Sequence, residues 1–326
     1  MKPARYYIQQ AIAGSSALLL MLGVALAEPL KISVSRTPLS LPFYVAESQG
    51  YFAAEGVQIK IEDVIGGHRS MQQMLNAEAD LATCSDAVIM FNSFKRSDFA
   101  VIASFVSSDN DVKIIVGKDT DLSRPTLWSG KRIATVVGAA SHYYLDNWLL
   151  FQGVDPRAVH TINYQPEAME AALAKGEVEA VAIWEPYPFK IIHAVSGSKV
   201  LPNPAIYVMT FNLIAHKKLL GVRDDDLLRL LHALDRAEHF IKDEPRKAQA
   251  ILRSRLQLDQ AFIDWIWPHN LYQLSLDQSL LSTLESEARW AKSENHVAQT
   301  ESPNYLNFTY ATPLRKVLPI AVGIAK

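Results

Sequence analysis

The stretch "LKISVSRTPLSLPFYVAESQGYFAAEGVQIKIEDVIGG" (30–67) switches between two hydrophobic periods. Leu30–Val34 alternates apolar and polar side chains, which predicts a strand. A helix is expected over Pro42–Gln49, because proline is favoured in its first turn and a glycine follows its end. Val57–Val64 predicts a second strand, closed by two glycines. The segment therefore reads as strand, helix, strand.

The same alternation continues beyond residue 67. Ser70 is expected to cap a helix that buries Met71, Met74 and Leu75, and Leu81–Cys84 predicts a third strand. Strands and helices that alternate with short connections are typical of a parallel sheet covered by helices. The fold class predicted for the chain is therefore α/β.

A second α/β unit follows, and the remaining chain is mainly helical. A separate set of strands and helices predicts a second lobe with its own sheet. In that unit we expect strands at 113–116, 131–137 and 178–184, with helices at 141–152 and 166–175; the later helices are expected at 245–256, 260–267 and 276–292, after an apolar stripe that begins near residue 224.

Two short segments of the chain are alike. "NAEADLATCSD" (76–86) aligns without gaps on "KGEVEAVAIWE" (175–185) when Ala77 is set against Gly176. Asp80 then matches Glu179. Each copy reads as a helix end, an acidic turn and a buried strand, which suggests two related units.

Composition limits the class of protein. A chain of 326 residues with 49% hydrophobic residues is long enough for two domains with their own cores. The formal net charge of −2 and the absence of a basic stripe argue against a nucleic-acid partner. Cys84 is the single cysteine, so no intrachain disulfide can form. We expect a monomer.

The N-terminus has the pattern of a secretory signal peptide. Lys2 and Arg5 precede an apolar segment from Ala11 to Leu26, and "ALA" (25–27) fits a cleavage site. A membrane anchor is the alternative, but small polar residues interrupt the segment and leave it shorter than about 20 residues. We expect cleavage after residue 27 and export to the periplasm.

Signatures of catalysis are scarce. No G-x-S-x-G or H-E-x-x-H motif occurs, and one cysteine cannot build a structural zinc site. Ser141 and His142 are adjacent in a predicted helix, so their side chains point about 100° apart and cannot act as nucleophile and base for each other. No catalytic residue, metal or cofactor is expected.

Polar and small residues gather where strands end and helices begin, which is where open α/β sheets bind ligands. Gly138–Ser141 favours an anion, because small residues expose the first N–H groups of a helix. Ser141 could instead be a plain N-cap, and His142 a solvated residue. Core packing is the alternative for Trp184 and Phe43. The candidate ligand-binding residues are Thr37, Pro38, Leu39, Ser40, Phe43, Gly67, His68, Cys84, Ser85, Asp86, Gly138, Ala139, Ala140, Ser141, His142, Trp184 and Glu185.

The chain resembles the periplasmic substrate-binding proteins of ABC importers for sulfonates, taurine, nitrate and thiamine pyrimidine precursors. It departs from the family pattern at Ala77 and Glu179, and Ala139–Ala140 lacks the hydroxyls often found there. The resemblance is carried in order by 41–67 quoted above, "MLNAEADLA" (74–82), "LWSGKRIATVVGAASHYYLDNWLLFQGVD" (127–155), "ALAKGEVEAVAIWEPY" (172–187) and "PNYLNFTYATPLRKVLP" (303–319).

The resemblance implies two α/β lobes that close on a ligand by a hinge. We expect a first lobe from 28–106, a second from 107–215, and a return to the first over 216–326. The implied function is capture of a small organic anion, such as an aliphatic sulfonate or taurine, for an ABC permease and its ATPase. Nitrate, bicarbonate, an aromatic carboxylate or a pyrimidine are alternatives. If Asp86 and Glu185 face the cleft, the ligand carries an amine.

Two other roles remain possible for such a fold. One is an enzyme that resembles the pyrimidine-precursor synthases, which are intracellular and carry a cluster of cysteines. The signal peptide and the solitary Cys84 argue against it. The other is a binding lobe that serves a membrane sensor, which the sequence does not separate from an importer.

Overall fold

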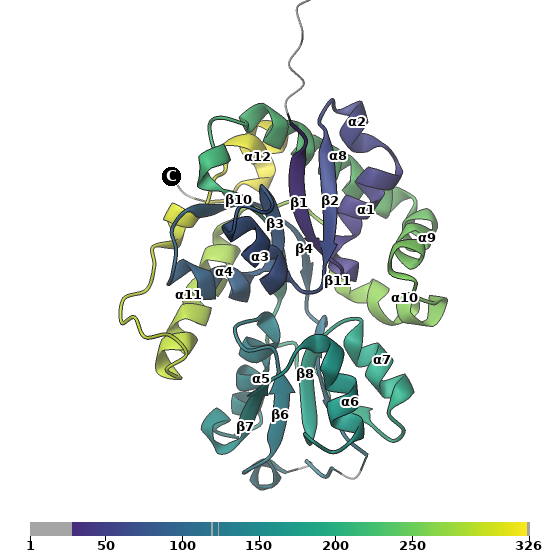
Figure 1. The fold of residues 1–326 in the computed structure, drawn as a ribbon, viewed down its shortest axis with the longest axis vertical. Helices are drawn as coiled ribbons and strands as arrows, with labels where there is room; N and C mark the ends of the chain where they lie inside the picture. The colour runs from purple at the N-terminus through teal and green to yellow at the C-terminus, as the bar shows by residue number, and fades with distance from the viewer. Residues whose placement is uncertain (1–27, 119, 123, 325–326) are drawn as a thin grey trace, which may run out of the picture.

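The computed structural model describes residues 28–118, 120–122 and 124–324, so the expected signal peptide lies outside the described residues. The chain forms two lobes, each built on one mixed sheet with helices on its faces (Figure 1). This is the α/β architecture that the sequence predicts. No helix within the described ranges is long and apolar enough to cross a membrane.

The first lobe contains a six-stranded sheet in the order β11-β4-β10-β3-β1-β2. Strand β1 pairs in parallel with β2 and β3, as the alternating strands and helices of 30–85 require. Strand β10 runs antiparallel between β3 and β4. The strands are β1 Leu30–Ser35, β2 Ile59–Val64, β3 Leu81–Ser85, β4 Phe99–Ser108, β10 Met209–His216 and β11 Asn270–Leu271.

The second lobe contains a five-stranded sheet in the order β7-β6-β8-β5-β9. Strand β6 is parallel to β7 and β8, and β5 runs antiparallel to β8. The strands are β5 Val112–Val116, β6 Arg132–Thr135, β7 His160–Asn163, β8 Ala180–Trp184 and β9 Lys199–Val200.

The chain crosses between the lobes twice, after β4 and after β9. The return to the first lobe occurs earlier than the expected boundary at residue 215, because β10 belongs to the first sheet. Its buried Asn212 receives a hydrogen bond from Ser104 of β4 (2.6 Å) and donates one to the Cys84 carbonyl of β3 (3.3 Å). Residues 209–215 therefore belong to the first lobe and not, as expected, to the second.

Helices cover both sheets, and the C-terminal helices wrap the first lobe. Helix α8 packs on α1 and α12, α9 on α1, and α11 on α4 (Figure 1). The helices are α1 Leu41–Ser48, α2 Tyr51–Ala54, α3 Gly67–Leu75, α4 Asp86–Ser93, α5 Ala140–Phe151, α6 Met169–Ala174, α7 Tyr187–Ala194, α8 Asp224–Asp243, α9 Pro245–Leu256, α10 Gln260–Ile266, α11 Gln278–Ser293 and α12 Thr312–Val317.

Ser70 does not cap a helix. Helix α3 begins at Gly67, so Ser70 lies in its first turn with its side chain buried against the sheet. Its hydroxyl donates to the Ser33 carbonyl of β1 (2.5 Å) and accepts from the Thr83 N–H of β3 (3.0 Å). This serine therefore fixes α3 to two strands.

The repeated segments occupy equivalent places in the two lobes. In the first, Asp80 accepts a hydrogen bond from the backbone N–H of Lys31 at the start of β1 (3.0 Å). In the second, Glu179 accepts one from the N–H of Arg132 at the start of β6 (2.7 Å). Each acid thus connects the start of one strand to the start of the neighbouring strand. This shared role explains why Asp80 and Glu179 occupy matching positions in the two repeated segments.

The turn before each acid requires a left-handed residue. Gly176 has φ of 68°, and Ala77 adopts φ of 61° in the matching position. An alanine with a left-handed backbone costs about 1 kcal/mol relative to glycine. Ala77→Gly should therefore raise the free energy of unfolding by about that amount, and Gly176→Ala should lower it similarly, measured by urea denaturation.

Ala174→Gly is the matched control, because Ala174 is exposed within helix α6. Ala174 is the last residue of α6, so glycine there should lower stability by less than the ~1 kcal/mol that it costs in a helix interior. Equal effects of Ala77→Gly and Ala174→Gly would contradict the backbone argument.

Candidate functional site

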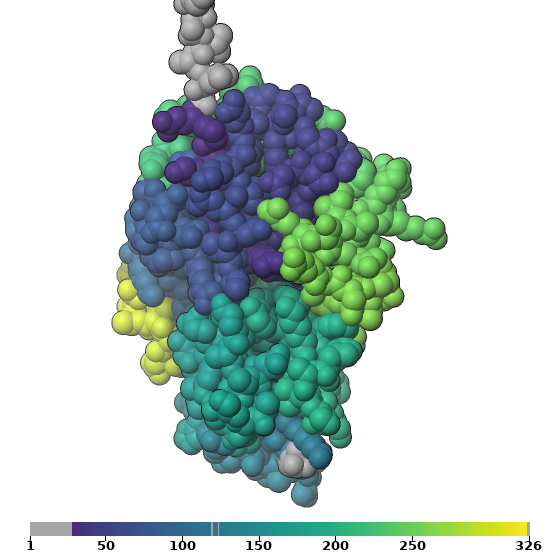
Figure 2. Space-filling view, turned by 45° about the vertical axis from the view of Figure 1, so that its right-hand side comes forward, coloured from purple at the N-terminus to yellow at the C-terminus, as the bar shows by residue number. Residues whose placement is uncertain are grey.

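A cleft lies between the two lobes, and Figure 2 shows the line along which they meet. The space enclosed measures about 340 Å³, counting the part open to solvent. The lining residues are Ser35, Thr37, Leu39, Gly67, His68, Ser85, Val88, Asp111, Ala139, Ala140, Trp184, Met209 and Phe211.

Strand ends and helix starts position most of these groups. Ser35, Ser85 and Trp184 are the last residues of β1, β3 and β8, and Gly67 and Ala140 are the first residues of α3 and α5. The carboxyl ends of parallel strands lie at one edge of a sheet, so both lobes present this edge to the cleft. The N-termini of α3, α4 and α5 therefore meet at it, and their first N–H groups favour an anion.

Two glycines allow the first-lobe loop to lie this close. A Cβ on Gly67 would lie 2.8 Å from the Cα of Cys84, so no larger residue fits between α3 and β3. Gly66 has φ of 85°, and a Cβ there would meet the ring of His68 at 2.6 Å. Helix α3 can therefore point its N-terminus into the cleft only with both glycines.

Hydroxyl groups line the first-lobe wall. Thr37 accepts a hydrogen bond from the Leu39 N–H (3.1 Å), which holds the loop after β1 in a tight turn. Within the described residues, the hydroxyls of Ser35 and Ser85 make no hydrogen bond to another protein group. Both are therefore available to a ligand.

His68 adds a neutral polar group beside an aromatic wall. Its ring lies 6.1 Å from that of Trp184, centroid to centroid, across the two lobes. Burial lowers the pKa of this imidazole to about 4, with the nearby Arg69 charge adding to the effect. The buried Nδ1 has no hydrogen-bond partner among the described residues.

Asp111 is the one acidic side chain among the residues named as lining the cleft. It follows β4 in the first crossover and is 5% exposed. Its Oδ2 atom is buried and has no hydrogen-bond partner among the described residues. Burial raises the pKa of this carboxyl to about 8; the charge of Lys113 opposes the shift and that of Glu185 adds to it.

Sequence reasoning missed Asp111 as a binding residue. The pattern Asp109-Asn110-Asp111 is typical of a solvated turn, and only the crossover between the lobes buries its last residue. Ser35, Val88, Met209 and Phe211 were also missed. Ser35 directly follows the predicted strand Leu30–Val34 and could have been found by the strand-end rule.

Glu185 does not line the cleft. It is buried, accepts a hydrogen bond from Trp265 Nε1 (2.6 Å) and forms an ion pair with Lys113 (2.8 Å). Trp265 belongs to α10 of the first lobe, which Figure 2 shows reaching the second lobe at the right. The carboxylate therefore fastens the two lobes and is not free for an amine.

Asp86 is also occupied by internal partners. It is fully buried, accepts a hydrogen bond from the Tyr207 hydroxyl and accepts another from the Thr210 N–H (3.0 Å). Burial raises the pKa of its carboxyl to about 6. Because Tyr207 lies in the second crossover, Asp86 fixes that crossover to α4.

Ser141 is not the N-cap of its helix. Helix α5 begins at Ala140 with Ala139 as cap, and no side chain caps it. The Ser141 hydroxyl is buried and accepts a hydrogen bond from Thr135 Oγ1 (2.8 Å). The expected anion loop thus reaches the cleft through Ala139 and Ala140, while Ser141 braces α5 against β6.

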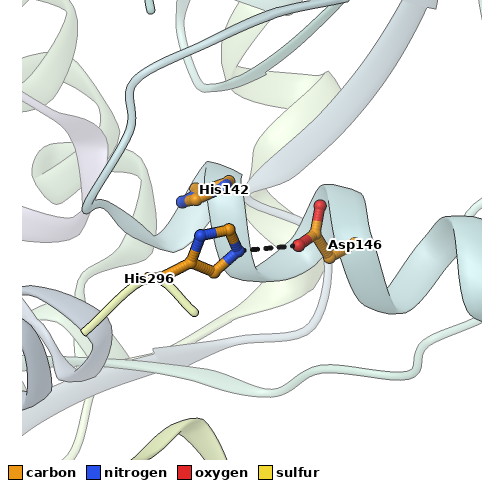
Figure 3. Close-up of side chains that lie close together, drawn as sticks. All are labelled: His142, Asp146 and His296. Atoms are coloured by element: carbon orange, nitrogen blue, oxygen red, sulfur yellow. Dashed lines mark hydrogen bonds and ion pairs between the residues drawn. The ribbon is translucent and has the colours of Figure 1, made fainter. Parts of the chain in front are cut away.

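His142 is buried rather than solvated. Figure 3 shows it beside Asp146 of the same helix and His296 from the segment after α11. Burial lowers the pKa of its imidazole to about 4, while the charge of Asp146 opposes this shift. His142 does not line the cleft.

The remaining predicted residues support the cleft from behind. Ser40 donates to the Ser35 carbonyl (2.7 Å), and the Pro38 carbonyl accepts from Tyr272 (3.1 Å). Phe43 packs edge-on against Phe105 in the core. Of the seventeen predicted residues, those that the structure places on the cleft are Thr37, Leu39, Gly67, His68, Ser85, Ala139, Ala140 and Trp184; those it places elsewhere are Pro38, Ser40, Phe43, Cys84, Asp86, Gly138, Ser141, His142 and Glu185.

Two lobes, two crossovers and a polar cleft between them define the periplasmic-binding-protein fold. A family model described as NMT1/THI5 like matches residues 37–248. The chain belongs to this family.

Known relatives are binding proteins. The chain is 22% identical over 230 residues to a Bacillus subtilis (strain 168) protein described as a candidate aliphatic sulfonates-binding protein, covering 68% of this chain and 69% of the relative. It is 24% identical over 161 residues to the taurine-binding periplasmic protein of Escherichia coli (strain K12), covering 49% of this chain and 50% of that protein.

Solved structures share the fold. The periplasmic aliphatic sulphonate-binding protein SsuA of Escherichia coli superimposes with a TM-score of 0.74 at 16% identity, covering 87% of this chain and 92% of that one. The desulfurization enzyme DSZB superimposes with a TM-score of 0.65 at 14% identity, covering 89% and 99%. The fold therefore serves both binding and catalysis.

The unpartnered carboxyl of Asp111 should make stability depend on pH. Its pKa near 8 lies above the usual value near 4, so the folded chain keeps a proton that the unfolded chain releases. The free energy of unfolding therefore falls as pH rises from about 4 to about 8. Asp111→Asn should remove this loss, on the order of 3 kcal/mol, in urea unfolding at pH 5 and pH 8.5.

Asp109→Asn is the control, because its carboxyl is half exposed. This variant should keep the wild-type difference between the two pH values. If the free energy of unfolding of Asp111→Asn differs between pH 5 and pH 8.5 as much as that of the wild type, Asp111 is not the buried acid responsible.

Proposed function

We propose that this protein captures a small organic anion of the sulfonate class between its lobes and delivers it unchanged to an ABC permease. The observation that carries the proposal is the meeting of three helix N-termini with unpaired hydroxyls in a cleft lined by both lobes. A sulfonate offers three oxygen acceptors to such donors. The family and the binding proteins named above support the same role.

Contacts from both lobes allow a bound ligand to stabilise the closed conformation of the cleft. A ligand shifts a protein toward a conformation only through its differential affinity for that conformation. Ser35, Thr37 and Ser85 belong to one lobe, whereas Ala140 and Trp184 belong to the other. Only the closed arrangement brings both sets to one ligand, so binding drives hinge closure.

The buried carboxyl of Asp111 favours ligands that carry a positively charged group in addition to the anionic one. Lys113 already forms an ion pair with Glu185, and no described residue forms an ion pair with Asp111, although the charge of Lys113 acts on it. A bound ammonium group would compensate the carboxylate, whereas an anion without one would leave it uncompensated or protonated. We therefore infer an amino-sulfonate such as taurine, with its sulfonate at the helix N-termini and its amine at Asp111.

Binding is favoured over catalysis. The single cysteine, Cys84, is buried behind the cleft, and burial raises the pKa of its thiol. His68 is held neutral and has no nucleophile bonded to it. We propose that the ligand leaves unmodified, so incubation with purified protein should return it intact.

Transport also requires a location and a partner. The relatives named for taurine and sulphonate binding are periplasmic, and the signal-peptide pattern of residues 1–27 fits export. We propose a periplasmic monomer that docks on its permease through both lobes. Nitrate, bicarbonate, aromatic carboxylates and pyrimidines lack a cation to match Asp111 and are disfavoured.

Calorimetric titration with taurine and with isethionate tests the proposal, because isethionate replaces the amine by a neutral hydroxyl. The wild type should bind taurine at least tenfold more tightly. Asp111→Asn should abolish this preference, since the uncharged amide no longer attracts an ammonium group. Asp109→Asn should retain it.

The outcomes separate the two parts of the proposal. Failure of the wild type to bind any sulfonate would overturn the sulfonate function. Equal affinity for taurine and isethionate, unchanged in Asp111→Asn, would overturn the amine contact alone and leave sulfonate binding in place.

A further inference from the structure

A second cluster of ligating side chains lies beside the cleft, outside the residues that line it. His142, Asp146 and His296 each offer one ligating atom, and these atoms all lie within 4.8 Å of one another. Figure 3 shows the ring of His296 beside that of His142, with a dashed line from His296 to the carboxylate of Asp146. Only one direct hydrogen bond joins the three, from His296 Nε2 to Asp146 Oδ2 at 3.2 Å.

The cluster takes its members from both lobes. His142 and Asp146 stand four residues apart on α5, so they share one face of that second-lobe helix. His296 follows α11, which packs on α4 of the first lobe. A group bound by all three would therefore join α5 to the first lobe.

The donor set suits a transition-metal ion. Two imidazoles and a carboxylate are typical ligands of Zn²⁺, and metal-bound imidazoles must be unprotonated. Among the described residues, the ring of His142 takes part in one hydrogen bond, a long one of 3.5 Å from the Gly138 N–H to Nδ1, which a metal could replace at small cost.

The surroundings hold the carboxylate in place. Trp290 of α11 donates its indole N–H to Asp146 Oδ2 (3.1 Å), and its ring packs against those of both histidines. Such outer hydrogen bonds orient metal ligands and strengthen binding. Ligand atoms around a tetrahedral zinc ion lie ~3.3 Å apart, given bonds of about 2.0 Å. The widest separation in the cluster, up to 4.8 Å, must therefore shrink by about 1.5 Å. His296 lies on an exposed segment and can supply this movement.

We propose that His142, Asp146 and His296 form an interlobe site for a divalent transition-metal ion of the Zn²⁺ class, with water completing its coordination. The sequence alone does not predict this site, because His296 lies 150 residues beyond Asp146. The ion would stabilise the contact between α5 and the segment after α11. It would act beside the ligand cleft without touching the ligand.

Titration with ZnCl₂ in the absence of sulfonate tests the site directly. The wild type should bind one ion, and Co²⁺ should give the visible bands of a four-coordinate site. His296→Ala, from the first lobe, and Asp146→Asn, from the second, should each weaken Zn²⁺ binding at least tenfold. The double variant should be little worse than either single variant, because both remove ligands of the same ion.

His239→Ala is the matched control, because its side chain is 68% exposed on α8, away from the cluster. It should bind Zn²⁺ as the wild type does. Absence of Zn²⁺ binding in the wild type would overturn the proposal, and so would unchanged affinity in either His296→Ala or Asp146→Asn. Because no sulfonate is present, neither result bears on the ligand cleft.

Discussion

Two buried carboxyl groups, those of Asp111 and Glu185, lie near one lysine, Lys113, at the junction of the lobes. Lys113 pairs with only one of them, and the charge properties of the cleft follow from this. Lys113 pairs with Glu185 at 2.8 Å, and Glu185 also holds Trp265 of the first lobe. Among the described residues, Asp111 therefore has no ion pair, and its buried Oδ2 atom has no hydrogen-bond partner. Breaking the Glu185 contacts would cost stability, so the protein cannot redirect Lys113 to Asp111 cheaply.

The Asp111 carboxyl shares the cleft with the helix N-termini. Helices α3 and α4 of the first lobe and α5 of the second bring partial positive charge to the cleft, and the unpaired carboxyl lies in the crossover between the lobes. On the proposed function, the helix N-termini would bind the sulfonate and Asp111 would bind the ammonium group of the same ligand. Both lobes would then contact that ligand, because the cleft is lined by residues of both.

Local rules recovered most of the fold and part of the site. Strand alternation and helix ends located β1, β2, β3 and α9 to within a few residues, and the strand-end rule brought His68, Ser85 and Trp184 to the cleft. Each of these depends on residues close in the sequence.

Long-range partners account for what sequence reasoning missed. The hydroxyls of Ser70 and Ser141 look like helix caps, yet each bonds to a strand that only the tertiary fold brings near. Asp86 and Glu185 look available to a ligand until Tyr207 and Lys113 occupy them. Asp111 looks solvated until the lobes bury it. Sequence patterns show which groups are polar, but only the packing shows which remain unpaired.

Proton release on taurine binding tests the central claim most directly. Free Asp111, with a pKa near 8, is mostly protonated at pH 7, and an ammonium ligand should ionise it. Calorimetry in buffers of different ionisation enthalpy should therefore show close to one proton released per taurine bound at pH 7, and none in Asp111→Asn. A binding enthalpy independent of the buffer in the wild type would contradict the account.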